Sequence, residues 1–350
     1  MLTTLNESQL AGGSRLRVYR FVTPGECPSR FIEYQIWSMG FERWRETALD
    51  HHYWRLYYRD HLANDVSSSV VDYLYFAEVD GVLCSRLWFA YSRRSGLGNF
   101  GNVFTEPAYR RRGLMKALLY PCVEDFMSSD ALMLCCGAGA GHAAREYCRA
   151  GFEQIYGGEP GTGGSMSLHR PDLGRFLDYA SSRFAGDSIS LVRAGEAGDQ
   201  FDVDKFLYYI PEMLHHPGDH RAFAGMRIQD YRFVWQEVLN GNGVVVVAEN
   251  ELGAIVGYAY VLRAFTGNGY LLDFRLHPSY VADGSRLLLG ALSRFREVTG
   301  SSNPVRAYVM SCDAYKVELS DSVFDCETVL KDAEIAGGKP VDVMVFKSRD

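Results

Sequence analysis

The features that this sequence lacks exclude several classes of protein. It contains no run of about 18 apolar residues, so it offers no membrane-spanning helix. Its first 20 residues include three arginines and lack the apolar stretch of a secretory signal. The eight cysteines form no C-x-x-C pair, and no histidine cluster has the spacing of zinc ligands. We therefore expect a cytoplasmic protein with no membrane or metal role, whose cysteines stay reduced in the core.

Positive charge is also scarce. The 350 residues include 36 Lys and Arg against 43 Asp and Glu, for a net charge of −7. Residues 1–187 carry 20 basic and 21 acidic side chains, whereas residues 188–350 carry 16 and 22. Because an acidic chain repels a phosphate backbone, nucleic acid is not an expected partner. The uneven charge indicates that the two halves do different work.

An internal repeat organises the chain. The N-terminal copy begins with strands at 71–79 and 82–92, which the hairpin signal Asp80-Gly81 joins. Its further predicted elements are a strand at 99–105, a helix at 114–127, a strand at 131–136 and a helix at 142–149 that Gly151 ends. The C-terminal copy has predicted strands at 244–249, 254–263 and 270–276, a helix at 285–298 and a strand at 305–311.

The two copies share a fixed offset. Pro278, Tyr280 and Gly284 each lie 171 residues after Pro107, Tyr109 and Gly113. Each half also opens on a strand and then a helical stretch, with predicted strands at 16–21 and 188–193 and a second-half helix at 201–213. The same order of elements at one offset indicates duplication, and 350 residues exceed a single comfortable core. We therefore predict domains at 1–170 and 188–350, joined by a helical linker at 171–187.

The segment Val103–Lys116 (VFTEPAYRRRGLMK) has the pattern of an anion site. A strand leads into a turn of three arginines and a glycine, and a helix starts directly after it. The first amides of a helix lack internal partners, so such a turn suits a pyrophosphate. Gly113 lets the backbone approach the ligand, and the arginines add charge-assisted hydrogen bonds. An isolated arginine run would more simply be a solvated turn, but its place between strand and helix favours the anion site.

Two motifs resemble the GNAT superfamily of acyltransferases. Arg110-x-x-Gly113-x-Met115 is similar to the acyl-CoA motif [RQ]-x-x-G-x-[GA], with Met115 replacing the small last residue. Ala143-x-x-x-Tyr147-x-x-x-Gly151-Phe152 is similar to the family pattern A-x-x-x-Y-x-x-x-G-F. The resemblance implies an α/β (α+β) fold of two tandem GNAT-like domains, each a mixed, mostly antiparallel sheet flanked by helices. The family often has an asparagine seven residues before the tyrosine, where this chain has Ala140.

The resemblance also implies roles for residues of the N-terminal half. The pantetheine arm of acetyl-CoA, or of another acyl-CoA, would pair with the backbone of Val103, Phe104 and Thr105. The pyrophosphate would bind at the turn and first helical amides, formed by Arg110, Arg111, Arg112, Gly113, Leu114, Met115 and Lys116. Tyr147 would act as the general acid that protonates the leaving thiolate. The sequence shows no evident general base; Glu106, His142 or a water chain are the alternatives.

The C-terminal half departs from this pattern. Val281 stands where Arg110 stands, and Asp283 stands where Arg112 stands. An aspartate would repel a pyrophosphate, so this half is predicted to lack the cofactor site and to shape the acceptor cleft. The aromatic segment Trp44–His61 either covers that cleft or packs as an amphipathic helix.

The predicted function is transfer of an acetyl group from acetyl-CoA to an amine of a small-molecule acceptor. Two alternatives remain open at this point. One is an enzyme with a longer acyl donor or a hydroxyl acceptor. The other is a CoA-binding sensor or scaffold without catalysis.

Overall fold

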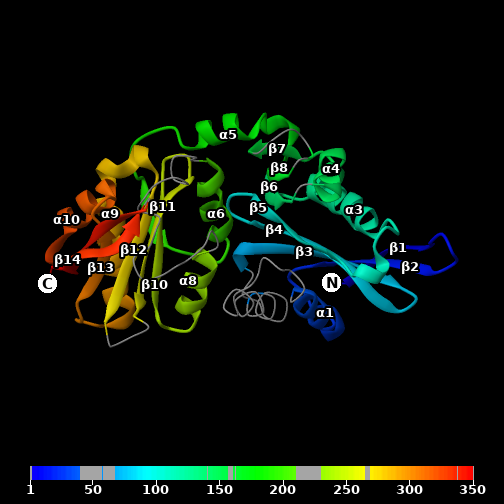
Figure 1. The fold of residues 1–350 in the computed structure, drawn as a ribbon, viewed down its shortest axis with the longest axis horizontal. Coiled ribbons are helices and arrows are strands. Elements are labelled where there is room, and N and C mark those ends of the chain that lie inside the picture. The colour runs from blue at the N-terminus through cyan, green and yellow to red at the C-terminus, as the bar shows by residue number, and fades with distance from the viewer. Residues whose placement is uncertain are drawn as a thin grey trace. The chain divides into compact units, whose positions relative to one another are not determined.

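The computed structural model divides into two compact units, Met1–Tyr179 and Ala180–Asp350. Each unit is built on a sheet of its own (Figure 1). The structure describes residues 2–39, 57, 68–139, 141–156, 161, 163–209, 230–264, 269–336 and 338–349.

The described residues of the N-terminal unit form eight strands of one sheet. The strands are β1 (Leu2–Gln9), β2 (Arg15–Val22), β3 (Val70–Val79), β4 (Val82–Ser92), β5 (Leu97–Thr105), β6 (Met133–Ala138), β7 (Glu153–Tyr156) and β8 (Gly164–His169). The helices are α1 (Ser29–Met39), the 3-10 turn η2 (Pro107–Tyr109), α3 (Leu114–Ser128), α4 (His142–Arg149), the 3-10 turn η3 (Pro171–Leu173) and α5 (Phe176–Arg183). The division between the units falls within α5.

The strand order of this sheet is β1-β2-β3-β4-β5-β6-β8-β7. All neighbours pair antiparallel except β5 and β6, which run parallel. Since α3 connects β5 to β6, these two strands and the helix form one β-α-β crossover. The crossover places the turn after β5 and the start of α3 at one end of the sheet.

Helices cover both faces of the N-terminal sheet (Figure 1). On one face, α3 and α4 join a core with alternate strand residues such as Tyr75 and Phe89. On the other face, Phe31 of α1 packs against Tyr19 and Phe76, with ring centroids 5.2 and 5.0 Å apart. The alternation of β3 thus sends Tyr75 to one helix layer and Phe76 to the other. The face of α3 that is buried carries Leu114, Leu118, Leu119, Cys122 and Phe126.

The C-terminal unit repeats this topology. Its strands are β9 (Leu191–Ala194), β10 (Gly243–Glu249), β11 (Ile255–Arg263), β12 (Tyr270–Leu276), β13 (Val305–Met310), β14 (Phe324–Ala336) and β15 (Lys339–Ser348). Its helices are α6 (Asp199–Tyr209), α8 (Asp230–Leu239), the 3-10 helix η5 (Pro278–Asp283), α9 (Ser285–Thr299) and α10 (Ala314–Val323). The order β10-β11-β12-β13-β15-β14 matches β3-β4-β5-β6-β8-β7, and β12 and β13 are again its parallel pair.

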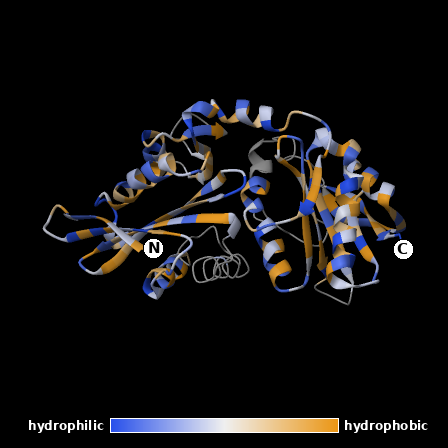
Figure 2. Cartoon of the chain, turned by 180° about the vertical axis from the view of Figure 1, so that it is seen from behind, coloured by the Kyte–Doolittle hydropathy of each residue, from blue (hydrophilic) through white to orange (hydrophobic). Residues whose placement is uncertain are grey.

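The C-terminal sheet also has a helix layer on each face. Residues of α9 and of α10 form one core with the sheet, whereas α8 packs on the opposite face through Tyr231, 6.1 Å from the ring of Tyr258. The strands of both sheets are rich in hydrophobic residues, and the helices alternate hydrophobic and polar positions (Figure 2). This pattern is typical of amphipathic helices packed on a sheet.

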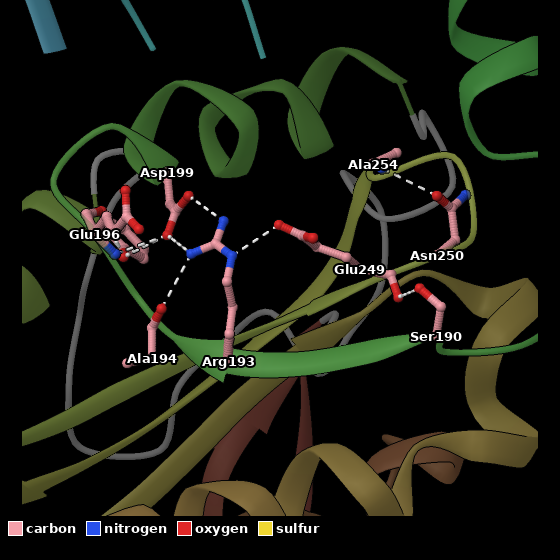
Figure 3. A network of polar contacts seen from close by, with 9 residues as sticks. Ser190, Arg193, Ala194, Glu196, Asp199, Glu249, Asn250 and Ala254 are labelled. Atoms are coloured by element: carbon pink, nitrogen blue, oxygen red, sulfur yellow. Dashed lines mark hydrogen bonds and ion pairs between the residues drawn. The ribbon is translucent and has the colours of Figure 1, made fainter. Parts of the chain in front are cut away.

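A buried ionic network fixes the start of the C-terminal unit (Figure 3). Arg193 of β9 binds Asp199 of α6 at 2.7 Å and Glu249 of β10 at 2.8 Å. Asp199 also accepts a hydrogen bond from the backbone N–H of Glu196 at 2.7 Å. Tyr231 of α8 donates to the carbonyl oxygen of Glu196 at 2.8 Å. The Arg193 guanidinium therefore joins β9, α6 and β10, and Tyr231 attaches α8 through the Glu196 carbonyl.

The structure confirms the predicted α+β class and the predicted repeat of elements. The strand at 82–92, the helix at 142–149 and the strand at 270–276 have the predicted bounds. The sequence predictions missed β1 and the hairpins β7–β8 and β14–β15. The predicted strand at 188–193 begins only at Leu191. Four cysteines are buried, as expected of core thiols, but Cys312 and Cys326 are exposed. Of the described helices, none is long and apolar enough to cross a membrane.

Candidate functional site

The two parallel strands of the N-terminal sheet separate after a short ladder. Only Leu97–Asn99 of β5 pair with Met133–Cys135 of β6. Within the described part of the chain, the ladder does not continue along Phe100–Thr105. The hydroxyl of Ser85 donates to the carbonyl of Phe104 at 2.9 Å, so that carbonyl points toward β4. Successive residues of a strand direct their backbone N–H and C=O groups to opposite edges. The backbone groups of Val103 and Thr105 therefore point toward the edge from which β6 has diverged.

The turn after β5 has the backbone of an anion cradle. Arg111 has a φ of 63° and Gly113 a φ of 79°, both in the left-handed region. Arg110 before them is extended, with a φ of −64° and a ψ of 160°. Left-handed residues allow a turn to present successive N–H groups to an anion. Gly113 is the N-cap of α3 and has no side chain with which to bind the first helical amides. The turn and the uncapped helix start thus present donors to a ligand at one place.

The basic side chains of the turn have neighbours of their own. Arg110 donates through Nε to the carbonyl of Thr105 at 3.0 Å, which ties the turn back to β5. The guanidinium of Arg112 lies 5.2 Å from the ring centroid of Tyr109. Lys116 forms an ion pair with Glu146 of α4 at 3.1 Å. All three cations remain exposed, so the turn stays basic at its surface.

Glu146 connects the first turn of α3 to α4. Its carboxylate is 1 % exposed and pairs with both Lys116 and Arg149. Burial by itself would raise the pKa of Glu146, but hydrogen bonds and charges from Lys116 and Arg149 outweigh it and lower that pKa. Glu146 therefore stays ionised and holds the helix that carries Tyr147 against the helix that carries the cradle.

Tyr147 lies beside the point where β5 leaves β6. Its side chain is 6 % exposed, and its ring meets Phe100 edge-on at 5.2 Å. Phe100 is the first residue of β5 beyond the ladder with β6. The predicted catalytic tyrosine is thus next to the diverging strands and is also a member of the core.

The spacing of Tyr147, Gly151 and Phe152 has a structural cause. Gly151 has a φ of 101°, the N–H of Phe152 donates to the Tyr147 carbonyl at 3.0 Å, and the N–H of Gly151 donates to the Cys148 carbonyl at 3.1 Å. These are the bonds of a Schellman helix end, and the contact of Tyr147 with Phe152 at 5.6 Å completes it. The structure confirms the predicted helix-ending role of Gly151. The spacing alone therefore reflects helix capping, and a catalytic role for Tyr147 depends on its place beside β5.

Glu106 follows the last residue of β5 directly. Its backbone N–H donates to the Cys84 carbonyl at 2.9 Å, and burial raises the pKa of its carboxyl. A raised pKa brings a carboxylate closer to the range useful for accepting a proton. His142, the other residue considered for this role, is exposed at the start of α4.

Two buried charged residues of the N-terminal sheet are not singled out by the sequence motifs. Arg86 of β4 is 0 % exposed and donates to the carbonyl of Asn102 on β5. Asp72 of β3 is also 0 % exposed and accepts hydrogen bonds from Tyr57 and Trp88, each at 2.8 Å. Arg86 is the single charged residue of β4, and Asp72 is one of two in β3, with Glu78. A charged residue within a mostly apolar strand is the signal that could have identified both.

The corresponding turn of the C-terminal unit has another structure. Gly284 is right-handed, with a φ of −65°, and a Cβ there would lie 2.7 Å from the side chains of Leu276 and Leu319. Close packing therefore requires a glycine at position 284. Asp283 accepts hydrogen bonds from the N–H of Ile189 and from Arg286, both at 2.9 Å. Here η5 runs into α9 without a left-handed cradle, and the turn carries a carboxylate.

An ion pair occupies the edge of β12 in the C-terminal unit. The ladder between β12 and β13 comprises only Tyr270 and Leu271 opposite Val305 and Arg306. Beyond it, Asp273 binds Lys316 of α10 at 2.8 Å, and the lysine side chain is 6 % exposed. Asp273 also accepts a hydrogen bond from Tyr260 of β11 at 3.3 Å.

Some predicted features lie outside the described residues. These are Ala140 and, apart from Tyr57, the aromatic segment 44–61. Among the residues that the structure does describe, no group of three or more His, Cys, Asp or Glu could hold a metal ion.

Comparison with known proteins places a family match in the N-terminal unit. The model of the acetyltransferase (GNAT) family matches residues 33–152, about a third of the chain. This range includes the turn after β5, α3 and α4, which supports the predicted resemblance of the N-terminal half. A search of curated proteins finds no match.

Several solved structures are similar to part of the chain. A phosphinothricin acetyltransferase of the GNAT superfamily from Sinorhizobium meliloti, in complex with AcCoA, is 18% identical and has a TM-score of 0.38; the match covers 45% of this chain and 86% of that one. A ribosomal-protein-alanine N-acetyltransferase from Brucella melitensis is 20% identical with a TM-score of 0.35, over 45% and 98% of the chains. A GNAT-family acetyltransferase from Streptococcus pneumoniae is 18% identical with a TM-score of 0.37, over 45% and 97%.

Proposed function

We propose that the N-terminal unit transfers an acetyl group from acetyl-CoA to an amine of a small-molecule acceptor. The observation that carries the proposal is the open edge of β5 beside a left-handed turn at an uncapped helix start. An extended amide-containing arm fits the first feature, and a pyrophosphate fits the second. The family match over residues 33–152 supports the same assignment.

The residues of the site suit the two ends of this cofactor. The backbone of Val103 and Thr105 would bind the pantetheine arm, since both residues face the diverging edge. The amides from Arg111 to Lys116 would bind the pyrophosphate, and the exposed arginines would add positive charge. Acetyl-CoA supplies the activated thioester when it is bound there.

Two proton transfers accompany the proposed reaction. As the acceptor nitrogen bonds to the acyl carbon and the carbon–sulfur bond breaks, the sulfur must gain a proton and the nitrogen must lose one. Tyr147, beside the end of the β5–β6 ladder, would donate the proton to sulfur. Glu106, whose pKa burial raises, would accept the proton from nitrogen.

We further propose that the C-terminal unit is a GNAT-like copy that does not bind acyl-CoA. Two observations favour this: the right-handed Gly284 and the carboxylate of Asp283. A carboxylate at the helix start repels a pyrophosphate, and the packed Gly284 leaves no cradle. One cofactor site per chain is the consequence.

Replacement of Tyr147 by phenylalanine tests the catalytic proposal. We expect kcat with acetyl-CoA and an amine panel to fall by roughly 10²–10⁴-fold, because a general acid is lost. Affinity for CoA should change by less than about twofold, since the ring and its contacts remain. The control is Tyr120→Phe, at a tyrosine of α3 that is 44% exposed. Full turnover in Tyr147→Phe would remove Tyr147 from the mechanism, and CoA binding without any turnover in the wild type would favour a sensor.

A further inference from the structure

A β-bulge interrupts the ladder between β4 and β5. Arg86 pairs with Phe104, and Trp88, two residues further along β4, pairs with Gly101, three residues earlier in β5. Leu87 therefore faces two residues of β5. Asn102, the first of these two, has a φ of 52° in the left-handed region. Such a bulge bends its strand and turns its carbonyl out of the ladder. This bulge follows the end of the β5–β6 ladder at Asn99 and includes Val103, the first of the proposed cofactor residues.

A buried arginine binds the bulged carbonyl. Arg86 is 0 % exposed, and its Nη1 donates to the carbonyl oxygen of Asn102. Its Nε donates to the hydroxyl of Ser38 in α1, and its Cζ lies 5.6 Å from the ring centroid of Phe104. A guanidinium without exposure is costly unless hydrogen bonds hold it, so its geometry is fixed by these partners. Arg86 thus joins α1, β4 and the bend of β5.

We propose that Arg86 is a positioning residue that sets the course of the β5 edge along which the pantetheine arm binds. The inference rests on the proposed acyl-CoA function. Without the guanidinium, the Asn102 carbonyl would lose a charged donor, and the bulge would no longer be held in its present conformation. The edge formed by Val103 and Thr105 would then shift. The phosphate cradle at Arg111–Lys116 is a separate element with its own backbone, so it should be unaffected.

This separation predicts a selective loss of affinity. We would titrate the full chain by calorimetry with CoA and with 3′-phosphoadenosine 5′-diphosphate, which keeps the phosphates and lacks the pantetheine arm. Arg86→Met should weaken CoA binding roughly tenfold, because the displaced β5 edge would lose a hydrogen bond to the pantetheine arm. It should change the affinity for the nucleotide fragment less than about twofold. Arg86→Lys and Ser38→Ala should weaken CoA in the same selective way but less, because each keeps part of the contact.

A second arginine with the same kinds of contact provides the control. Arg170, which follows β8, donates to the carbonyls of Ala131 and Ser129 in the segment between α3 and β6. Its Cζ lies 5.8 Å from the ring centroid of Phe126. Arg170→Met should leave both affinities unchanged. If Arg86→Met does not fold, Arg86→Lys and Ser38→Ala carry the test.

The outcomes distinguish a failure of the positioning role from a failure of the proposed function. Selective loss of CoA affinity in the Arg86 and Ser38 variants supports the positioning role. Wild-type affinity for CoA in a folded Arg86 variant, or an equal loss for both ligands, overturns it. A wild-type chain that binds neither ligand overturns the proposed function itself, and the positioning role with it.

Discussion

Replacement of Gly113 by alanine tests the phosphate cradle at its most constrained position. Gly113 has φ 79° and ψ 5°, and no atom would lie within 4 Å of an added Cβ. The substitution therefore acts through backbone strain and not through a clash. A residue with a Cβ pays about 1–2 kcal/mol in this conformation, and the stiffer unfolded chain offsets roughly 0.4–1 kcal/mol of it. The free energy of unfolding should fall by about 0.5–1 kcal/mol, a decrease of roughly 1–4 °C in Tm for a unit of this size.

The effect on CoA affinity should be larger than the effect on stability. If alanine moves residue 113 out of the left-handed region, the amides of the turn and of the first helical residues no longer converge. The loss of one hydrogen bond to a charged phosphate costs about 1.5–3 kcal/mol, which is a tenfold to roughly hundredfold weaker Kd. Calorimetric titration of acetyl-CoA and thermal unfolding of the same sample measure the two quantities.

Gly300 provides a matched control for the strain. It ends α9 with φ 61° and ψ 11°, and an added Cβ would also meet nothing within 4 Å. Gly300→Ala should therefore lower stability by a similar amount and leave CoA affinity unchanged. The reasoning is refuted if Gly113→Ala binds acetyl-CoA as tightly as the wild type, or if Gly300→Ala weakens binding equally.

Further predictions concern charged groups. Burial raises the pKa of Glu106, so its protonated form favours the folded state, and this contribution is lost as pH rises through the raised pKa. Glu106→Gln should therefore stabilise the chain more at neutral pH than at pH 4. The same substitution should remove the acid limb of the pH–rate profile. The lowered pKa of Glu146 gives the opposite sign, so the stability that Glu146→Gln removes at neutral pH should disappear as pH falls through that lowered pKa, as urea titrations at several pH values would show. Asp199→Ala should lower the unfolding free energy of the C-terminal unit by about 3–5 kcal/mol, because it leaves the buried Arg193 with one partner fewer. The exposed pair of Asp178 and Arg175 is the comparison: Asp178→Ala should cost less than about 1 kcal/mol, and equal losses would contradict the account.

Strong local signals made much of the fold predictable from the sequence. The Asp80-Gly81 turn fixes the hairpin of β3 and β4, and both residues have the positive φ that such a turn needs. Gly113 marks the start of α3, and Gly151 marks the end of α4. At these positions the chain leaves one backbone conformation for another, and a single residue type fits the change.

Other elements have no such signal. Strand β1 is an edge strand whose side chains are mostly exposed, so its sequence shows no apolar alternation. It is held by pairing with β2 and by ion pairs such as Arg17 with Glu7 at 3.0 Å. Strand β14 also exposes most of its side chains and depends on its pairing with β15. Long-range pairing decides these elements, and local periodicity does not report it.

The position of the candidate site could be predicted from the sequence, but the contacts that hold its backbone could not. The motifs locate the turn after β5 and Tyr147, and the structure brings both to the diverging end of the β5–β6 pair. The bulge at Asn102 and its contact with Arg86 depend on a one-residue difference in register between two strands. No periodicity of the sequence encodes such a shift. The single arginine within a mostly apolar strand is the one local feature that indicates it.

The most direct test of the account is the number of acetyl-CoA molecules that bind to one chain and the unit that binds them. The measurement is a calorimetric titration of the wild type, of an Arg112→Glu/Gly113→Asp variant and of a Ser285→Asp variant at the matching turn of the C-terminal unit. The account predicts one site per chain, lost in the first variant and retained in the second. No binding by the wild type, two sites per chain, or a site that disappears only with Ser285→Asp would contradict it.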